Sequence, residues 1–467
     1  MARHLRVSFL AAWLIALPAV GLSQSLAPAE VRSIGAPVVT KLWAAEHVYQ
    51  GPPALLNHAR LMTRLDAAVK EGAGLFEIEQ IGQSVEGRSI NHVWFGSGPM
   101  HVLLWSQMHG DEATATTALL DILHILANHR LDPPVQRLLQ QLTIHFVPMV
   151  NPDGAERWQR RNAQGIDINR DALLLQSPEG RALKALRDRL QPALGFNLHN
   201  ENWRTSAGKT KPASISLLAV AFDEAGTETP ARLLAKRTCA VIRLSAETLV
   251  PGQVARYDED FEERAFGDNI TKGGTPVVLI ETGPYVGDNA DQELVKLNVV
   301  AILTALDALA SGAVNDADAG LYTALPVNKS NLYTVIIRNA SIVPGTGVAP
   351  FTGDIALDST RAVREPDAGG ERREVQAFRV ADLGDMRVFA TLEPVDATGL
   401  FAVASQGWKA GETVEIPDWV TFRSWRPLAV GANTDIALLR PAAPGRFTVV
   451  RLIPAERLLG TAPHGAD

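Results

Sequence analysis

Short apolar runs alternate with amphipathic stretches along residues 55–309 of the chain. Compact apolar runs between turn signals are typical of buried strands, and a helical repeat of apolar positions is typical of helices that bury one face. The pattern predicts strands at 101–106, 142–149, 194–198, 215–219 and 276–280, and helices at 113–127, 178–190, 230–242 and 291–309. Strands that alternate with helices indicate an α/β fold, in which a sheet with parallel members carries helices on both faces.

The pattern changes after residue 311. Residues 313–319 are small and acidic, which is typical of a linker. Beyond them we predict strands at 333–338, 375–380, 386–392, 434–439 and 447–452, separated by turns rich in Gly and Pro. The charged segment 361–374 is expected to be a solvated loop. The chain therefore divides into a signal segment at 1–25, an α/β domain at 45–312 and a smaller, mostly-β accessory domain at 320–460.

The N-terminus resembles a secretory signal peptide. Arg3, His4 and Arg6 precede an apolar run, and small residues follow it. An uncleaved membrane anchor is the alternative, and no later stretch is expected to cross a bilayer. Cys239 is the only cysteine, so no internal disulfide can form, and we expect it to be a small core residue. A periplasmic or secreted protein fits these features best.

The bulk composition excludes some functions. The chain has 467 residues, of which 46% are hydrophobic and 20% are charged, as in ordinary globular proteins. Its formal net charge is −7, and it has no basic stripe. A nucleic-acid partner is therefore not expected.

Polar residues follow several of the predicted strands. His109 and Glu112 come directly after the strand at 101–106, and His199 and Glu281 follow two later strands, with the turn Asn151-Pro152-Asp153-Gly154 after another. Parallel strands bring ligands to the edge at their carboxyl ends, so these groups are expected at one edge of one sheet. A nitrogen and a carboxylate three residues apart can bind one cation, and the set as a whole suggests a hydrolytic zinc site.

The supply of histidines narrows the choice of a further metal ligand. No histidine occurs between His199 and His464, and His199 follows a predicted strand, so it is the best candidate. His145 alternates within a strand and is expected to be a packed core residue. His124 and His129 lie on or after a helix and are expected to be structural or exposed.

Several motifs occur together in a characteristic order. They are Ser84-Val85-Glu86-Gly87-Arg88, His109-Gly110-Asp111-Glu112, Asn151-Pro152-Asp153-Gly154, Gly165-Ile166-Asp167-Ile168-Asn169-Arg170, His199 and Ile280-Glu281-Thr282-Gly283. In this order they resemble the zinc carboxypeptidases of the carboxypeptidase A/B type, over roughly residues 55–310. The resemblance implies a three-layer α/β/α domain with a mixed, largely parallel sheet. It also implies a metallocarboxypeptidase that hydrolyses C-terminal residues from peptides with a zinc-activated water.

The resemblance also implies roles for individual residues. His109, Glu112 and His199 would bind one zinc ion, and Asp167 would orient His109. Glu281 would be the general base and later the acid. Arg160 would polarise the scissile carbonyl. Arg161 is the alternative if the alignment with the family motif shifts by one residue. Asn169 and Arg170 would bind the terminal carboxylate of the peptide substrate, and Tyr257 would cover it, unless Tyr257 is a loop aromatic packed on the sheet edge.

The chain departs from the digestive family members in three places. Asn200, Glu201 and Asn202 follow His199, where those enzymes have Ser and Tyr. An acidic segment at 258–263 either favours a basic substrate side chain or is a solvated loop, and the loop is the simpler interpretation. The segments 335–343 and 353–356 resemble the small β-sandwich of amidohydrolases, without their catalytic barrel. Two other functions remain open: a zinc-dependent amide hydrolase acting on cell-wall peptides or N-acyl amino acids, and a catalytically inactive binding protein.

Overall fold

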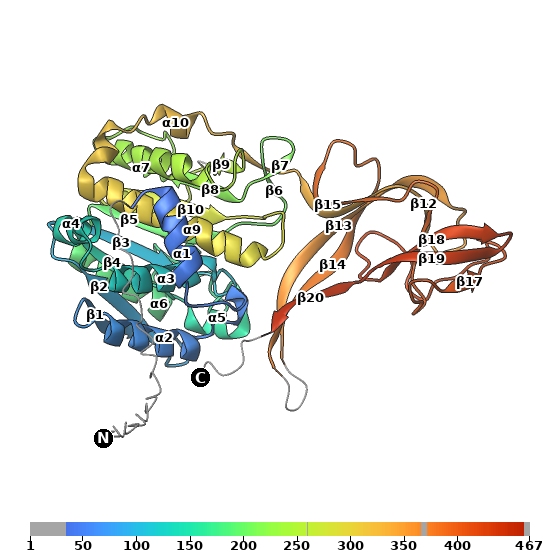
Figure 1. Ribbon diagram of the computed structural model, residues 1–467, viewed down its shortest axis with the longest axis horizontal. Coiled ribbons are helices and arrows are strands. Elements are labelled where there is room, and N and C mark those ends of the chain that lie inside the picture. The colour runs from blue at the N-terminus through green and yellow to red at the C-terminus, as the bar shows by residue number, and fades with distance from the viewer. Residues whose placement is uncertain (1–33, 259, 366–370, 462–467) are drawn as a thin grey trace, which may run out of the picture.

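The computed structural model describes residues 34–258, 260–365 and 371–461. The expected signal segment at 1–25 lies outside these residues. Two parts follow one another along the chain (Figure 1): an α/β part at 34–325, drawn in blue to yellow, and a β part at 328–461, drawn in orange to red.

The α/β part is built on one eight-stranded mixed sheet. In spatial order its strands are β1 (Phe76–Gln83), β2 (Ser89–Phe95), β4 (Leu142–Val147), β3 (Met100–Ser106), β5 (Leu194–Asn200), β10 (Val277–Thr282), β8 (Ile215–Ala219) and β9 (Val254–Arg256). The central strands β4, β3, β5 and β10 pair in parallel, so their carboxyl ends meet at one edge. All five strands predicted for this region are present.

Helices cover both faces of this sheet, as the alternation of apolar positions requires. One face packs on α1 (Ala36–Glu46), α2 (His58–Glu71), α3 (Thr114–Asn128), α4 (Pro133–Gln141), α7 (Pro230–Ala246) and α9 (Ala290–Ser311). The other packs on α6 (Pro178–Leu190) and α8 (Phe266–Lys272). The expected three-layer α/β/α architecture is confirmed. Cys239 is fully buried in the first of these cores, as predicted.

The prediction that no later stretch is long and apolar enough to cross a bilayer was wrong. Helix α9 is apolar enough over its 22 residues to qualify, but 83% of its apolar window is buried inside the protein. It contacts α1, α3, α4 and α7 and is the central helix of its layer. Its apolar character is therefore explained by protein contacts on several sides.

The expected linker at 313–319 was also wrong. Residues Ala313–Asp316 form a short 3-10 helix whose Val314 is buried in the core, and α10 (Gly320–Thr323) follows with Tyr322 buried. Small, acidic composition marked these residues as a linker. The single apolar side chain among them is enough to anchor the segment to the α/β part.

The β part contains a nine-stranded sheet. Its strands are β12 (Leu332–Val343), β13 (Phe351–Arg364), β14 (Arg373–Gly384), β15 (Ala390–Asp396), β16 (Phe401–Ala404), β17 (Thr413–Glu415), β18 (Ile436–Ala443), β19 (Arg446–Ile453) and β20 (Glu456–Thr461). A small sheet joins the two parts, because β11 (Asn328–Ser330) pairs with β6 (Thr205–Ala207), which also pairs with β7 (Lys211–Pro212). The expected mostly-β region is confirmed, although the strand predicted at 386–392 begins only at Ala390.

The solvated loop predicted at 361–374 was wrong at both of its ends. Residues 361–364 belong to β13 and pair with residues 373–376 of β14. The charges that suggested a loop are neutralised locally, because Arg361 forms ion pairs with Glu374 on the neighbouring strand and with Asp291 on α9. Figure 1 shows β13 and β14 on the side of the β part that faces the α/β part.

Candidate active site

The turn after β3 brings His109 and Glu112 together. The amide nitrogen of Glu112 donates to the carbonyl of His109 at 3.2 Å, and the side chain of Gln107 donates to the carbonyl of Gly110 at 2.9 Å. A side chain at Gly110 would overlap the backbone of Gly154 in the neighbouring turn. Glycine is therefore needed here so that the two turns can lie in contact.

Strand register places His199 beside Glu281. These two residues are direct neighbours in the parallel pair of β5 and β10. Side chains alternate along each strand, so His199 and Glu281 share the face that carries Leu279 and α8. The sequence thus brings the second histidine of the candidate site and the candidate base to one edge through strand pairing alone.

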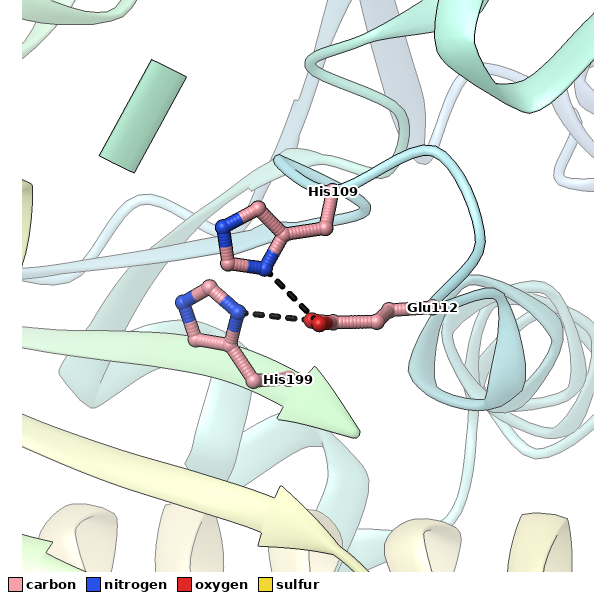
Figure 2. Close-up of side chains that lie close together, drawn as sticks. All are labelled: His109, Glu112 and His199. Carbon is pink, nitrogen blue, oxygen red and sulfur yellow. Dashed lines mark hydrogen bonds and ion pairs between the residues drawn. The ribbon is translucent and has the colours of Figure 1, made fainter. Parts of the chain in front are cut away.

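His109, Glu112 and His199 form a compact buried cluster (Figure 2). Both Nδ1 atoms face the Glu112 carboxylate, at 2.8 Å from Oε1 for His109 and 2.8 Å from Oε2 for His199. The three possible ligand atoms lie within 4.8 Å of one another. Two imidazoles and one carboxylate are a common ligand set for catalytic zinc, with a further position left for water. The residues present therefore fit a zinc ion.

Asp167 fixes the orientation of His109. Its Oδ1 lies 3.1 Å from Nε2 of His109, so the ring would donate from Nε2 when Nδ1 binds a cation. Burial disfavours the charged imidazole, but Glu112 and Asp167 outweigh this effect and raise the pKa of His109 to about 9. The site is thus strongly attractive to a cation beside His109.

Arg160 and Glu281 border the cluster. The Arg160 guanidinium lies 2.9 Å from Asp167 and 3.4 Å from Glu112, whereas Arg161 bonds to the carbonyl of Gly165. Glu281 is buried, and its Oε2 has no hydrogen-bond partner among the described residues. Burial, followed by the nearby carboxylates of Glu112 and Glu201, raises the pKa of Glu281 well above its usual value.

Part of the chain matches a known protein family. Residues 61–214 match the family model described as zinc carboxypeptidase. This part of the chain is similar to the zinc carboxypeptidases, and the match covers about a third of the chain. The matched segment ends before β10, so the position of Glu281 rests on strand register and not on the family match.

The curated relatives are distant. Carboxypeptidase E of Caenorhabditis elegans is 32% identical over 136 residues, which cover 25% of this chain and 29% of the worm protein. Human carboxypeptidase Z is 29% identical over 136 residues, or 25% of this chain and 21% of the human protein. The chain thus spans less than a third of the length of these relatives.

Solved structures are also similar to this chain. A carboxypeptidase from Burkholderia mallei gives a TM-score of 0.45 at 17% identity, covering 53% of this chain and 66% of that chain. Carboxypeptidase A from Helicoverpa armigera gives a TM-score of 0.44 at 16% identity, covering 59% and 80%.

A cavity of about 360 Å³ opens at this cluster. His109, Glu112, Arg160, Tyr257 and Glu281 all line it. The cavity therefore brings together most of the site residues expected from the sequence. Tyr257 is half-buried, and the carboxylate of Glu281, together with burial, raises the pKa of its phenol.

Asn169 and Arg170 are not among the residues that line this cavity. Asn169 is buried, and its Oδ1 accepts from the amide of Phe266 at 2.9 Å, which holds the start of α8. Arg170 donates to the carbonyl of Asn169 at 2.8 Å and lies 3.3 Å from the carboxylate of Glu262. Their expected role at the substrate terminus therefore remains a prediction.

Glu201 is a site residue that sequence reasoning did not identify. It is buried in the same cavity, accepts hydrogen bonds from Ser216 at 2.7 Å and from Asn328 at 3.0 Å, and burial raises its pKa to about 8. Glu201 follows His199 by two residues, and side chains two residues apart in an extended chain point to the same face. This spacing could have placed Glu201 on the side of His199. The contribution of Asn328 on β11 depends on tertiary structure and left no signal.

Of the histidines outside the cluster, His145 is buried, as predicted. It lies 2.9 Å from His92 and 2.9 Å from His101, in a row of three rings across neighbouring strands. His129 is buried between Glu46 and Asp132. Both have structural partners away from the cluster.

Proposed function

We propose that this protein is a metallocarboxypeptidase that uses one zinc ion to release C-terminal residues from peptides. The observation that carries the proposal is the cluster of His109, Glu112 and His199 at a cavity that Glu281 also lines. Oε2 of Glu281 has no hydrogen-bond partner among the described residues. Bound zinc in such sites lowers the pKa of a water molecule to about 7 and polarises carbonyl groups.

Glu281 supplies the proton transfers in this proposal. It takes a proton from the water that attacks the scissile carbonyl carbon, and it returns that proton to the amine when the carbon–nitrogen bond breaks. Its burial and the neighbouring carboxylates hold the pKa of Glu281 high, which suits a group that must accept a proton and then give it up. Its Oε2 is buried and has no hydrogen-bond partner among the described residues, so no protein donor there competes for the proton.

Arg160 supports the charge that develops on the carbonyl oxygen. Its guanidinium is already held by Asp167, and 44% of its side chain is exposed at the cavity. A donor that is fixed before the reaction stabilises the oxyanion at little cost in reorganisation. In typical enzymes each such donor lowers the activation free energy by about 3 kcal/mol. Tyr257, on the Glu281 side of the same cavity, would cover the C-terminal residue.

The test is a combined metal and activity measurement. Zinc content of the purified protein is determined together with release of C-terminal residues from a mixed peptide library, for the wild type and for Glu281→Gln. We expect stoichiometric zinc in both proteins, and a loss of kcat in the variant of about 10²–10⁴-fold because the general base is removed. Glu415→Gln, at an exposed position on β17, is the control. Absence of zinc from the wild type would refute the mechanism.

A zinc-dependent amide hydrolase acting on cell-wall peptides or N-acyl amino acids is the second candidate. Arg170 does not line the cavity and is paired with Glu262. It is therefore not free to bind a substrate carboxylate, which favours the amide hydrolase. Paired substrates that end in a carboxylate or in a carboxamide separate the two functions. Equal cleavage of both would favour the amide hydrolase.

A further inference from the structure

A second cavity of about 380 Å³ lies where the α/β part meets β13. The β13 residues Ser359, Thr360 and Arg361 line it on one side, and residues of the α/β part line it on the other. It shares five lining residues with the cavity at the metal cluster: Glu112, Arg160, Asn200, Glu201 and Asn202. The two cavities are therefore halves of one cleft that meet at the cluster.

The residues proposed for catalysis are distributed unevenly between the two halves. Tyr257 and Glu281 line only the half at the metal cluster. If Tyr257 covers the C-terminal residue, the rest of the peptide must leave the scissile bond in another direction. The half bounded by β13 is continuous with Arg160 and Glu112 and offers that direction.

An ionic network holds β13 in place as a wall. Nη1 of Arg361 lies 2.5 Å from Asp291 in the first turn of α9 and 3.1 Å from Glu374 on β14. Its guanidinium also lies over the ring of Trp203, at 4.4 Å from the ring centroid. Groups from three elements thus fix the strand against the α/β part, and the cavity keeps a defined shape without ligand.

Trp158 and Trp203 supply apolar surface to the cavity. Both are half-buried, line it, and are not members of the buried core clusters of the described residues. Trp158 ends α5 (Pro152–Arg157) in a left-handed conformation, with φ 49° and ψ 58°. This conformation is unfavourable for a bulky side chain, so it is retained only where the surroundings enforce it, often at functional sites.

We propose that the β part contributes to substrate selection, because β13 forms one wall of the cavity that would take the peptide on the N-terminal side of the scissile bond. The inference rests on the proposed function. The cavity is large enough for a ligand of more than one residue. The β part thus makes this enzyme selective for peptides that extend at least two residues upstream of the bond that is cleaved.

Substrate length tests the inference. Peptides with an identical C-terminal residue and one, two or three upstream residues, each with a blocked N-terminus, are compared by kcat/KM. We expect the wild type to gain about tenfold from one to three upstream residues, as partial burial of one large apolar group would give. Trp158→Ala, which removes apolar surface, is expected to lose most of this gain and to keep the rate on the shortest substrate.

A variant on the opposite wall tests the role of β13. Ser359 shares the strand face of Arg361 by alternation, so Ser359→Trp is expected to obstruct the cavity and remove the gain from length. Thr352→Trp, at an exposed position on the same strand, is the matched control, and Trp425→Ala is the control for loss of a tryptophan. The inference would be overturned if kcat/KM of the wild type did not depend on peptide length. It would also be overturned if the variants lowered kcat/KM equally for all substrates.

Binding to Glu281→Gln gives a second measurement that does not require turnover. The blocked peptide with three upstream residues is titrated while tryptophan fluorescence is followed, with and without Trp158→Ala in the same background. We expect the Trp158→Ala change to weaken binding by about fivefold to tenfold. Unchanged affinity would overturn the inference. If the protein cleaved only the shortest substrate, the inference would fail and the proposed function would stand. If it cleaved no peptide, the proposed function itself would be refuted.

Discussion

Glu262 lies between two arginines, Arg170 and Arg264. It lies 3.3 Å from Nε of Arg170 and makes two contacts with Arg264, at 3.0 and 2.8 Å. Arg264, which forms the stronger pair, and Arg170 lower the pKa of Glu262 to about 2. The carboxylate is therefore ionised at any pH near neutrality, and a substrate carboxylate must compete with it for Arg170.

Glu262→Gln should relieve this competition. If Arg170 binds the C-terminal carboxylate, the variant should lower KM for peptides with a free C-terminus by about twofold to fivefold, the range expected of an exposed ion pair. The kcat should not change, because Glu262 does not line the cavity at the metal cluster. Steady-state kinetics on carboxylate and carboxamide peptides measure both quantities, with the exposed neighbour in Glu263→Gln as the control. An unchanged KM would contradict the role predicted for Arg170.

Residue by residue, the sequence could predict which ligands come together but not how every site residue is held. His109 and Glu112 follow β3, His199 lies near the end of β5, and parallel pairing brings such positions to one edge. Glu201 was missed because its partner Asn328 lies on a strand beyond residue 311, where only a separate β region was predicted. The contact between Arg170 and Glu262 joins two loops, and no periodic pattern encodes such a contact.

At the scale of elements, the turn between β3 and α3 has little freedom. Its Gly110 lies against the backbone of the turn that begins α5, and its Gln107 adopts a left-handed conformation with φ 52°. Both ligands of the turn therefore depend on a close contact between two backbones.

Gly110→Ala should disturb that contact. The added methyl group would overlap Gly154, and because the obstacle is backbone, one of the two turns must move. We expect a loss of about 1–3 kcal/mol in the free energy of unfolding, as for other overpacked sites, and a lower zinc affinity. Urea denaturation and competition with a zinc chelator measure the two effects. Gly35→Ala, where the nearest atom is 4.0 Å away, should leave zinc affinity unchanged and lower stability only as far as alanine is a poorer N-cap of α1 than glycine. Full zinc affinity in Gly110→Ala would show that the turn tolerates the shift.

Buried strands were easier to predict than strands at the edges or the interface. The central strands are buried on both faces, because helices cover both sides of the sheet. β1 has few buried positions and alternates irregularly, which hides it from a periodicity argument. β13 carries charges whose partners lie on β14 and α9, so its sequence is typical of a loop although Glu374 opposite it is completely buried.

At the scale of the whole molecule, one arginine links the two parts. Arg361 on β13 is surrounded by Asp291 and Glu374, and its side chain is only 17% exposed. Burial first, and then the nearby Asp291, raise the pKa of Glu374 to about 7 although Arg361 opposes this. The network therefore holds more negative charge than positive, and its stability depends on the arginine.

Arg361→Ala should destabilise the protein more at high pH than at low pH. The folded-state pKa of Glu374 is above its unfolded value, so the contribution of protonated Glu374 is complete below about pH 4.5 and is lost as the pH rises through about 7. Without Arg361, the carboxylates of Asp291 and Glu374 have no positive partner in this network once both are ionised. We expect a loss of about 3 kcal/mol at pH 8, as for a broken buried pair, and a smaller loss at pH 5.5. Urea denaturation at both pH values measures the difference, and Arg446→Ala, whose ion pair with Glu415 is exposed, is the control. An equal loss at both pH values would contradict the charge balance assigned to this network, and no loss at all would show that other contacts hold β13 against the α/β part.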